Sequence, residues 1–124
     1  MMANPSIRNR QNEATECGLA CLAMAASVCG SEIDLPWLRQ NYPISLRGAN
    51  LKDLAAIAGG IGMTTRAVRC EVEELDQLRT PAILHWGFQH FILLKRVRRR
   101  QLEVFDPSRG DRRIPLAEAS QYFT

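Results

Sequence analysis

Three residues of this chain carry side chains that together suit nucleophilic catalysis, namely Cys17, His90 and Asp106. A cysteine attacks as its thiolate, and free cysteine is mostly protonated at neutral pH. A helix N-terminus and a nearby imidazole both lower the pKa of a thiol, and a carboxylate can hold that imidazole in the required orientation. The three residue types therefore predict a thiolate nucleophile, an imidazole base and an orienting acid.

The nucleophile is predicted to lie at the start of a long helix. Thr15 can cap this helix and Glu16 suits its first turn, so Cys17 falls near the helix N-terminus, followed by Gly18, where a substrate backbone could approach closely. Gly30 ends the helix. Apolar residues recur at helical spacing at Leu19, Leu22, Ala23 and Ala26. This alanine-rich helix is apolar on several sides, which predicts a position at the centre of the fold.

Two further helices are predicted before the strands begin. Asp34 can cap a short helix over Leu35–Asn41, and Asn50 with Asp53 can cap a third helix that Gly59-Gly60 would end. The apolar face expected for the third helix comprises Leu51, Leu54, Ala55 and Ala58.

The second half of the chain is rich in strand-forming residues. The expected strands are Thr65–Cys70, Ala82–Trp86, His90–Lys95 and Leu102–Phe105, with a turn at Arg98–Gln101, a short helix or loop at Glu71–Leu78 and a terminal helix at Leu116–Phe123. These elements predict an α+β fold, in which a helical N-terminal lobe packs on an antiparallel sheet. His90 then begins one strand, and Asp106 closes another.

Plainer interpretations of the same residues remain open from spacing alone. A cysteine in an Ala/Leu helix is usually a small buried hydrophobe, which is the role expected for Cys21 and Cys29. A histidine in a strand is often structural, and Asp-Pro commonly opens a turn. His85 competes with His90: the two would face opposite sides of one straight strand, but Gly87 can break that strand.

Composition excludes several other classes of protein. The 124 residues are 46% hydrophobic and 23% charged, which is typical of one globular domain, and no apolar run is long enough to span a membrane. The net charge is +3, partly from the arginines of residues 96–100, and no nucleic-acid-binding motif accompanies them. The four cysteines form no CxxC pair, so we expect reduced thiols and no metal site.

The segment from Gln11 to Met24 resembles the active-site segment of the bacteriocin-processing (C39, double-glycine) peptidases, which have a papain-like fold. The resemblance continues through Ser45–Leu54, Thr65-Arg-Ala, Pro81–Trp86, His90–Leu94 and Phe105–Pro107, and its closest likeness is to the colicin V/microcin type of exporter. It covers roughly residues 8–124 and implies one peptidase domain over 1–124, the N-terminal part of a larger ABC exporter.

The resemblance assigns roles to individual residues. The family's nucleophile falls on Cys17, its general base and acid on His90 rather than His85, its orienting acid on Asp106, and its oxyanion-hole glutamine on Gln11. Trp86 is a candidate wall of the substrate cleft, with core packing as the open alternative.

For function, the resemblance implies a cysteine endopeptidase that removes leader peptides after Gly-Gly or Gly-Ala, coupled to export. The alternative is a domain that binds leaders but cuts weakly; such degenerate domains lose the nucleophile, which this chain keeps at Cys17. The implied partners are the leader peptide and the exporter's transmembrane and nucleotide-binding domains, at the cytoplasmic side of the bacterial inner membrane. No cofactor is implied for the peptidase domain. ATP and Mg²⁺ belong to the transporter part, and no EF-hand loop or acidic cluster argues for calcium.

Overall fold

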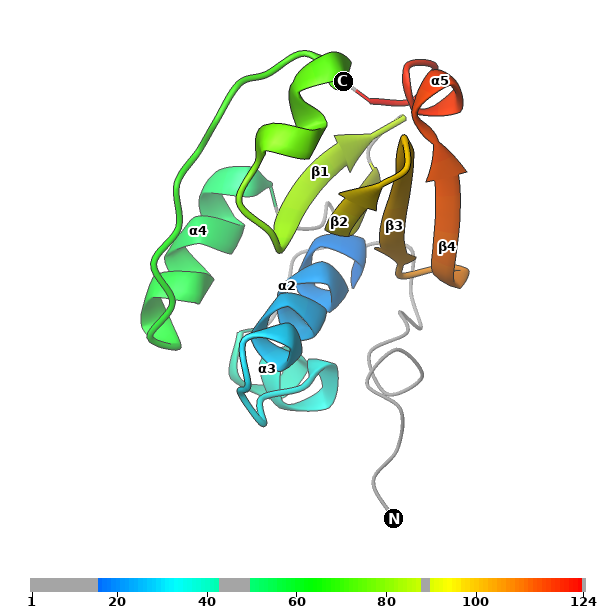
Figure 1. Ribbon diagram of the computed structural model, residues 1–124. Helices are drawn as coiled ribbons and strands as arrows, with labels where there is room; N and C mark the ends of the chain where they lie inside the picture. Colours follow the sequence, from blue (N-terminus) through cyan, green and yellow to red (C-terminus); the bar gives the residue numbers. More distant parts are fainter. Residues whose placement is uncertain (1–15, 43–49, 88–89, 124) are drawn as a thin grey trace.

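The computed structural model describes residues 16–42, 50–87 and 90–123, so the predicted Thr15 cap lies outside the described residues. Most of the helices precede the strands along the chain, and one short helix follows them (Figure 1). The elements are α2 (Cys17–Val28), α3 (Leu35–Asn41), α4 (Leu51–Gly60), the 3-10 helix η2 (Val72–Gln77), β1 (Ala82–Trp86), β2 (His90–Arg98), β3 (Gln101–Asp106), β4 (Gly110–Pro115) and α5 (Leu116–Ala119).

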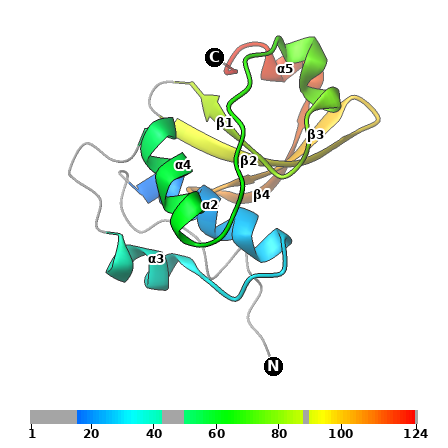
Figure 2. The same ribbon diagram turned by 90° about the vertical axis from the view of Figure 1, so that its left-hand side faces the viewer.

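The strands form one antiparallel sheet in the order β1-β2-β3-β4. Helices α2, α3 and α4 lie on one side of it, and η2 and α5 lie on the other (Figure 2). Because successive strand residues point to opposite faces, β2 contributes to both sides: Phe91 and Leu93 pack with Cys21 of α2, while Ile92 and Leu94 pack with Leu75 of η2. The predicted α+β architecture is confirmed.

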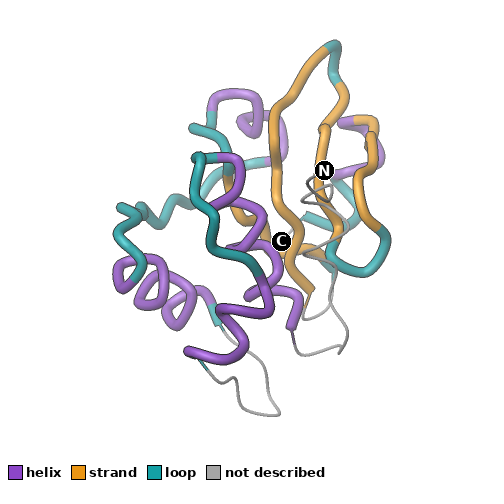
Figure 3. The backbone as a smooth tube through the Cα atoms, turned by 90° about the horizontal axis from the view of Figure 1, so that it is seen from below, coloured by secondary structure: helices purple, strands orange, loops and turns teal. Residues whose placement is uncertain are grey.

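Helix α2 lies at the centre of the molecule, as predicted. Each of its residues from Cys17 to Ala26 is buried, because α2 packs against β2, α3 and α4 together. Seen from below, most of the helical segments (purple) lie to one side of the strands (orange) (Figure 3). The helix ends at Val28, and Gly30 adopts a φ of 90°, a left-handed conformation that glycine supplies readily.

The two predicted helix caps are present. The Asp34 carboxylate accepts a hydrogen bond from the Trp37 N–H at 3.1 Å, which begins α3. At the start of α4, Asn50 accepts from the Asp53 N–H at 2.8 Å, and Asp53 accepts from the Asn50 N–H at 3.1 Å. These contacts satisfy backbone donors that have no partner within the helix.

Helix α4 ends where it was predicted to end, but its buried face differs from the prediction. Its last residue is Gly60, the second residue of the Gly59-Gly60 pair. Its buried face comprises Leu54, Ile57 and Ala58, whereas Leu51 and Ala55 are exposed, because the helix meets α2 along a narrower stripe than the apolar pattern suggested.

The three strands predicted after residue 81 are present as β1, β2 and β3. The turn between β2 and β3 forms as expected, with φ values of 54° at Arg99 and 60° at Arg100. In contrast, residues 65–70 belong to no strand of the described sheet and are mostly exposed, because a β-prone sequence forms a strand only with a pairing partner. The terminal helix is also shorter than predicted and ends at Ala119.

Strand β4 was not predicted, for a physical reason. It lies at the edge of the sheet, and only Gly110 and Ile114 of its six residues are buried, so its sequence is mostly polar. None of the helices in the described ranges is long and apolar enough to cross a membrane.

Candidate active site

Cys17 is the first residue of α2, and its side chain is buried near the start of β2. The first backbone N–H groups of a helix carry partial positive charge and have no partner within the helix. A thiolate at this position is therefore stabilised by the helix end, as predicted. A Cβ at Gly18 would lie 2.9 Å from Leu54 Cδ1 and 3.3 Å from Phe91 Cδ2, so the glycine allows α2 to pack closely, and an approach of substrate to Gly18 stays a prediction.

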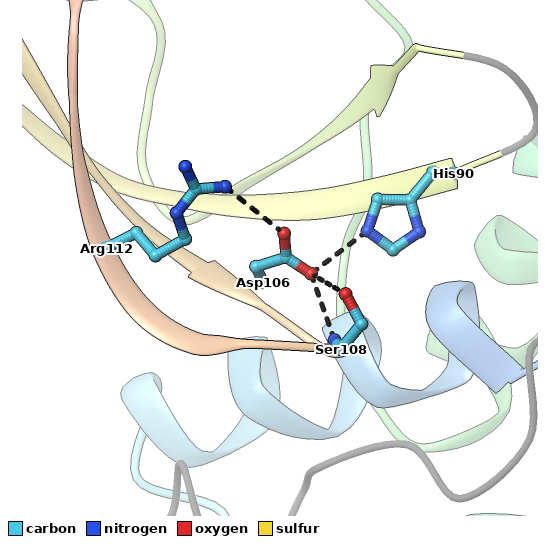
Figure 4. A network of polar contacts seen from close by, with 4 residues as sticks. All are labelled: His90, Asp106, Ser108 and Arg112. Carbon is cyan, nitrogen blue, oxygen red and sulfur yellow. Dashed lines mark hydrogen bonds and ion pairs between the residues drawn. The ribbon is translucent and has the colours of Figure 1, made fainter.

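His90 and Asp106 meet across the sheet. His90 begins β2, Asp106 ends β3, and Leu93 pairs with Phe105 between these strands. Both His90 and Asp106 lie at strand ends beyond this pair, where their side chains meet. His90 Nε2 lies 3.0 Å from Asp106 Oδ1 (Figure 4). The carboxylate can therefore fix the orientation and tautomer of the imidazole.

The Asp106 carboxylate is buried and accepts several hydrogen bonds. Its Oδ1 accepts from the Ser108 backbone N–H at 2.9 Å and from the Ser108 hydroxyl at 2.8 Å, besides the contact with His90. Its Oδ2 lies 3.6 Å from Arg112 Nη1 (Figure 4). Burial alone would raise the pKa of Asp106, but the donors from His90 and Ser108 together hold it well below its usual range. Asp106 thus stays ionised at working pH.

The Cys17 thiol contacts the same imidazole. Burial raises the pKa of Cys17, but its hydrogen bond with His90, backbone hydrogen bonds with Phe91 and Gly18, and the charge of His90 outweigh burial and lower it. Hydrogen bonds with Asp106 and Cys17 raise the pKa of His90 to about 9. Since Nε2 faces Asp106, Nδ1 is the nitrogen left for Cys17. These opposite shifts favour a thiolate–imidazolium pair.

The remaining predicted site residues are placed as follows. Gln11 lies outside the described residues. Trp86 pairs with His90 between β1 and β2, and its ring is buried and stacks on Tyr122 at 5.7 Å. Its role in binding substrate stays a prediction. His85 pairs with Phe91 and so points to the face opposite His90, with its ring edge-on to Phe91 at 5.3 Å.

The other cysteines lie in different environments. Cys21 is fully buried, as predicted, and burial raises its pKa well above the usual value, so its thiol stays protonated. The prediction that Cys29 is buried was wrong: it follows the last turn of α2 and is exposed. Within the described ranges, all four cysteines are free thiols, and no group of three or more metal-ligating side chains gathers.

A buried ion pair lies directly before Cys17. Both carboxylate oxygens of Glu16 accept hydrogen bonds from Arg39 of α3, through its Nε and, at 3.0 Å, its Nη2. Glu16 is only 5% exposed, so the guanidinium offsets the cost of burying its charge. This pair fixes the start of α2 to α3.

Ser108 and Arg112 contact the site but were not singled out from the sequence. Asp106-Pro107-Ser108 carries a usable signal, because an aspartate commonly accepts a hydrogen bond from the backbone two residues later. Arg112 pairs with Val104 and thus shares the face of Asp106, which becomes visible only once β4 is known.

The described geometry, with a cysteine at the start of the central helix and a histidine and an acid on the sheet, is that of a papain-like cysteine peptidase. Comparison with known families agrees. The model of the Peptidase C39 family matches residues 7–124, and this chain belongs to that family.

Individual relatives are similar over nearly the whole chain. The colicin V secretion/processing ATP-binding protein CvaB of Escherichia coli is 49% identical over 114 residues, which are 92% of this chain and 16% of that protein. The probable microcin-H47 secretion/processing ATP-binding protein MchF of the same species is 48% identical, with the same coverage. This chain thus spans about a sixth of the length of these curated relatives.

A solved structure shares the fold. The double glycine motif protease from an AMS/PCAT transporter, solved in complex with the leader peptide, superposes with a TM-score of 0.85 at 34% identity. The superposition covers 93% of this chain and 83% of that one.

Proposed function

We propose that this domain is a cysteine endopeptidase that cuts double-glycine-type leaders from bacteriocin, microcin or similar precursors during their export. The observation that carries the proposal is the contact of His90 with both Asp106, at 3.0 Å, and the thiol of Cys17 at a helix N-terminus. The likeness to a double glycine motif protease supports the substrate class.

The chemistry follows from this arrangement. The Cys17 thiolate adds to the carbonyl carbon of the second glycine, and the C–N bond breaks as the His90 imidazolium gives its proton to the leaving amine of the mature peptide. The leader is then held as a thioester. His90, now neutral, takes a proton from a water molecule that attacks the thioester, which frees the leader carboxylate and restores the thiolate. Asp106 orients His90 throughout.

Gln11 is the proposed donor to the oxyanion, together with the Cys17 backbone N–H. The assignment of Gln11 rests on the family resemblance of its segment. Removing one such donor typically lowers kcat by about 10²- to 10³-fold, so Gln11→Ala tests it directly. Trp86 is proposed as part of the wall that admits only glycine or alanine beside the scissile bond.

The setting of the domain is also proposed from its relatives. Their names describe secretion and processing by ATP-binding proteins, of which this chain matches about a sixth. The domain would therefore act at the cytoplasmic side of the inner membrane, beside the transmembrane and nucleotide-binding domains of an exporter. ATP and Mg²⁺ would serve those domains.

Cleavage of a synthetic leader peptide tests the proposal. The peptide ends in Gly-Gly followed by several residues, and mass spectrometry locates the cut. We expect cleavage after the second glycine, lost in Cys17→Ala and retained in Cys29→Ala, which removes an exposed thiol of the same segment. Binding of the leader without cleavage by wild type would instead support the leader-binding alternative.

A further inference from the structure

The hydroxyl of Ser108 has no part in the mechanism derived above, yet it lies beside the site. Ser108 follows Asp106 by two residues, in the turn between β3 and β4. It directs two donors at one carboxylate oxygen: its backbone N–H at 2.9 Å and its hydroxyl at 2.8 Å from Asp106 Oδ1 (Figure 4). The same oxygen accepts from His90.

The second oxygen of the Asp106 carboxylate, Oδ2, is contacted by a residue of β4. Arg112 of β4 places Nη1 3.6 Å from Asp106 Oδ2. A carboxylate can rotate about its bond to Cβ and exchange its two oxygens. Here, rotation would break both Ser108 contacts and separate Oδ2 from the guanidinium, so the group is held in one orientation.

We propose that Ser108 is a positioning residue, whose hydroxyl holds Asp106 Oδ1 where that oxygen accepts the hydrogen bond of His90. It acts through Asp106 and need not touch the substrate. The activity part of this inference rests on the proposed peptidase function, but the effect on His90 itself does not.

The other charged and titratable groups around this pair are few in the described part of the chain. Arg112 faces Asp106 from β4, Cys21 of α2 lies near Asp106, and the thiol of Cys17 faces His90 from α2. None of them is changed by a substitution at Ser108. The hydrogen bond from Asp106 is the largest cause that raises the pKa of His90. Loss of the Ser108 hydroxyl removes a competing donor from Oδ1, but it also lets the carboxylate turn away from His90. We expect the weakened contact with His90 to dominate and to lower the pKa of His90.

The test is an NMR titration of the imidazole C–H signals. The chain has two histidines, so His85→Gln assigns His90 without ambiguity. Because Cys17 and His90 titrate together, each variant is measured with Cys17 and in a Cys17→Ala background. We expect Ser108→Ala to lower the pKa of His90 by about half a pH unit or more. We expect Ser108→Thr, which keeps the hydroxyl, to retain the wild-type pKa.

Leader cleavage gives the second readout. We expect Ser108→Ala to lower kcat by about 10-fold, as for loss of a hydrogen bond to a charged group, with KM unchanged. Ser120→Ala is the matched control: its hydroxyl bonds the Ala117 carbonyl at 2.9 Å in α5, and neither readout should change.

Two results would overturn the inference: a folded Ser108→Ala variant whose His90 titrates as in wild type, or an equal shift in Ser108→Ala and Ser108→Thr. Ser108 is exposed, so we expect these variants to fold, and Ser108→Gly gives a second deletion of the hydroxyl should the alanine variant fail. If wild type cleaves no leader but the titration still shifts, the positioning role holds and the proposed function fails.

Discussion

His90 is held between an acid that stays ionised and a thiol that readily loses its proton. The pKa of Asp106 is far below its usual range, and that of Cys17 is also lowered, whereas that of His90 is raised to about 9. At a pH above the lowered pKa of Cys17 and below the pKa of His90, about 9, the site therefore holds a thiolate beside an imidazolium. Both groups are then in the protonation state that the first chemical step needs.

The pH dependence of kcat/KM should reflect this pair. Activity should rise as Cys17 loses its proton and fall as His90 loses its own, near pH 9. The measurement is kcat/KM for a double-glycine leader peptide from pH 5 to pH 10. In Asp106→Asn, we expect the alkaline limb to move down toward the ordinary histidine pKa of about 6.5. An alkaline limb that is the same in both proteins would contradict this account.

At the scale of single residues, the sequence indicated the three proposed reacting groups but not the residues that contact and position them. Residue type and resemblance were sufficient to select Cys17, His90 and Asp106, which the structure brings together. Ser108 was missed because serines are common in turns and only the position of the Asp106 oxygen distinguishes this one. The packing role of Gly18 was missed because its neighbours in space, Leu54 and Phe91, are distant in sequence.

The starts of helices α3 and α4 were predicted most accurately among the elements, because a helix cap depends on residues three positions apart. Asn50 and Asp53 satisfy each other's backbone at the start of α4. Asn50→Ala should therefore lower the free energy of unfolding by about 1 kcal/mol, measured by urea denaturation. Lys52→Ala, an exposed change in the same turn, serves as the control. Equal stability of the two variants would show that the cap contributes nothing.

The attachment of α2 to α3 can be tested at Arg39. Arg39→Ala leaves the buried Glu16 carboxylate without its two guanidinium donors, so we expect a loss of about 1–3 kcal/mol in unfolding free energy. Arg39→Lys should recover only part of it, since lysine cannot pair with both oxygens in the same way. Arg66→Ala, at an exposed site, is the matched control. A loss no larger than in the control would assign the ion pair no stabilising role.

The elements that were mispredicted depend on neighbours rather than on local pattern. Residues 65–70 have strand-forming side chains but no partner in the described sheet, and β4 has polar side chains but pairs with β3 along its full length. Pairing, unlike capping, is decided by segments far away in the chain. A single sequence therefore gives little information about which strands pair.

At the scale of the molecule, the sheet separates the hydrophobic cluster on its η2 side from the cluster on its α2 side that includes Cys17, and the site lies where α2 meets the sheet. Phe105, directly before Asp106, is fully buried in the cluster on the α2 side. Phe105→Ala should lower the free energy of unfolding by about 3–5 kcal/mol. Val68→Ala, at a position 58% exposed, should change it little. Similar urea midpoints for the two variants would mean that this contact is not central to stability.

The residues of the site come from two distant parts of the chain. His90 and Asp106 are 16 residues apart and belong to one hairpin, whereas Cys17 comes from the opposite end of the described chain. Contacts close in sequence generally form earlier in folding than distant ones. The imidazole and its acid can thus assemble while the thiol is still remote. Proteolytic competence would then appear only when the helical half docks on the sheet, so a partly folded chain would carry no working nucleophile.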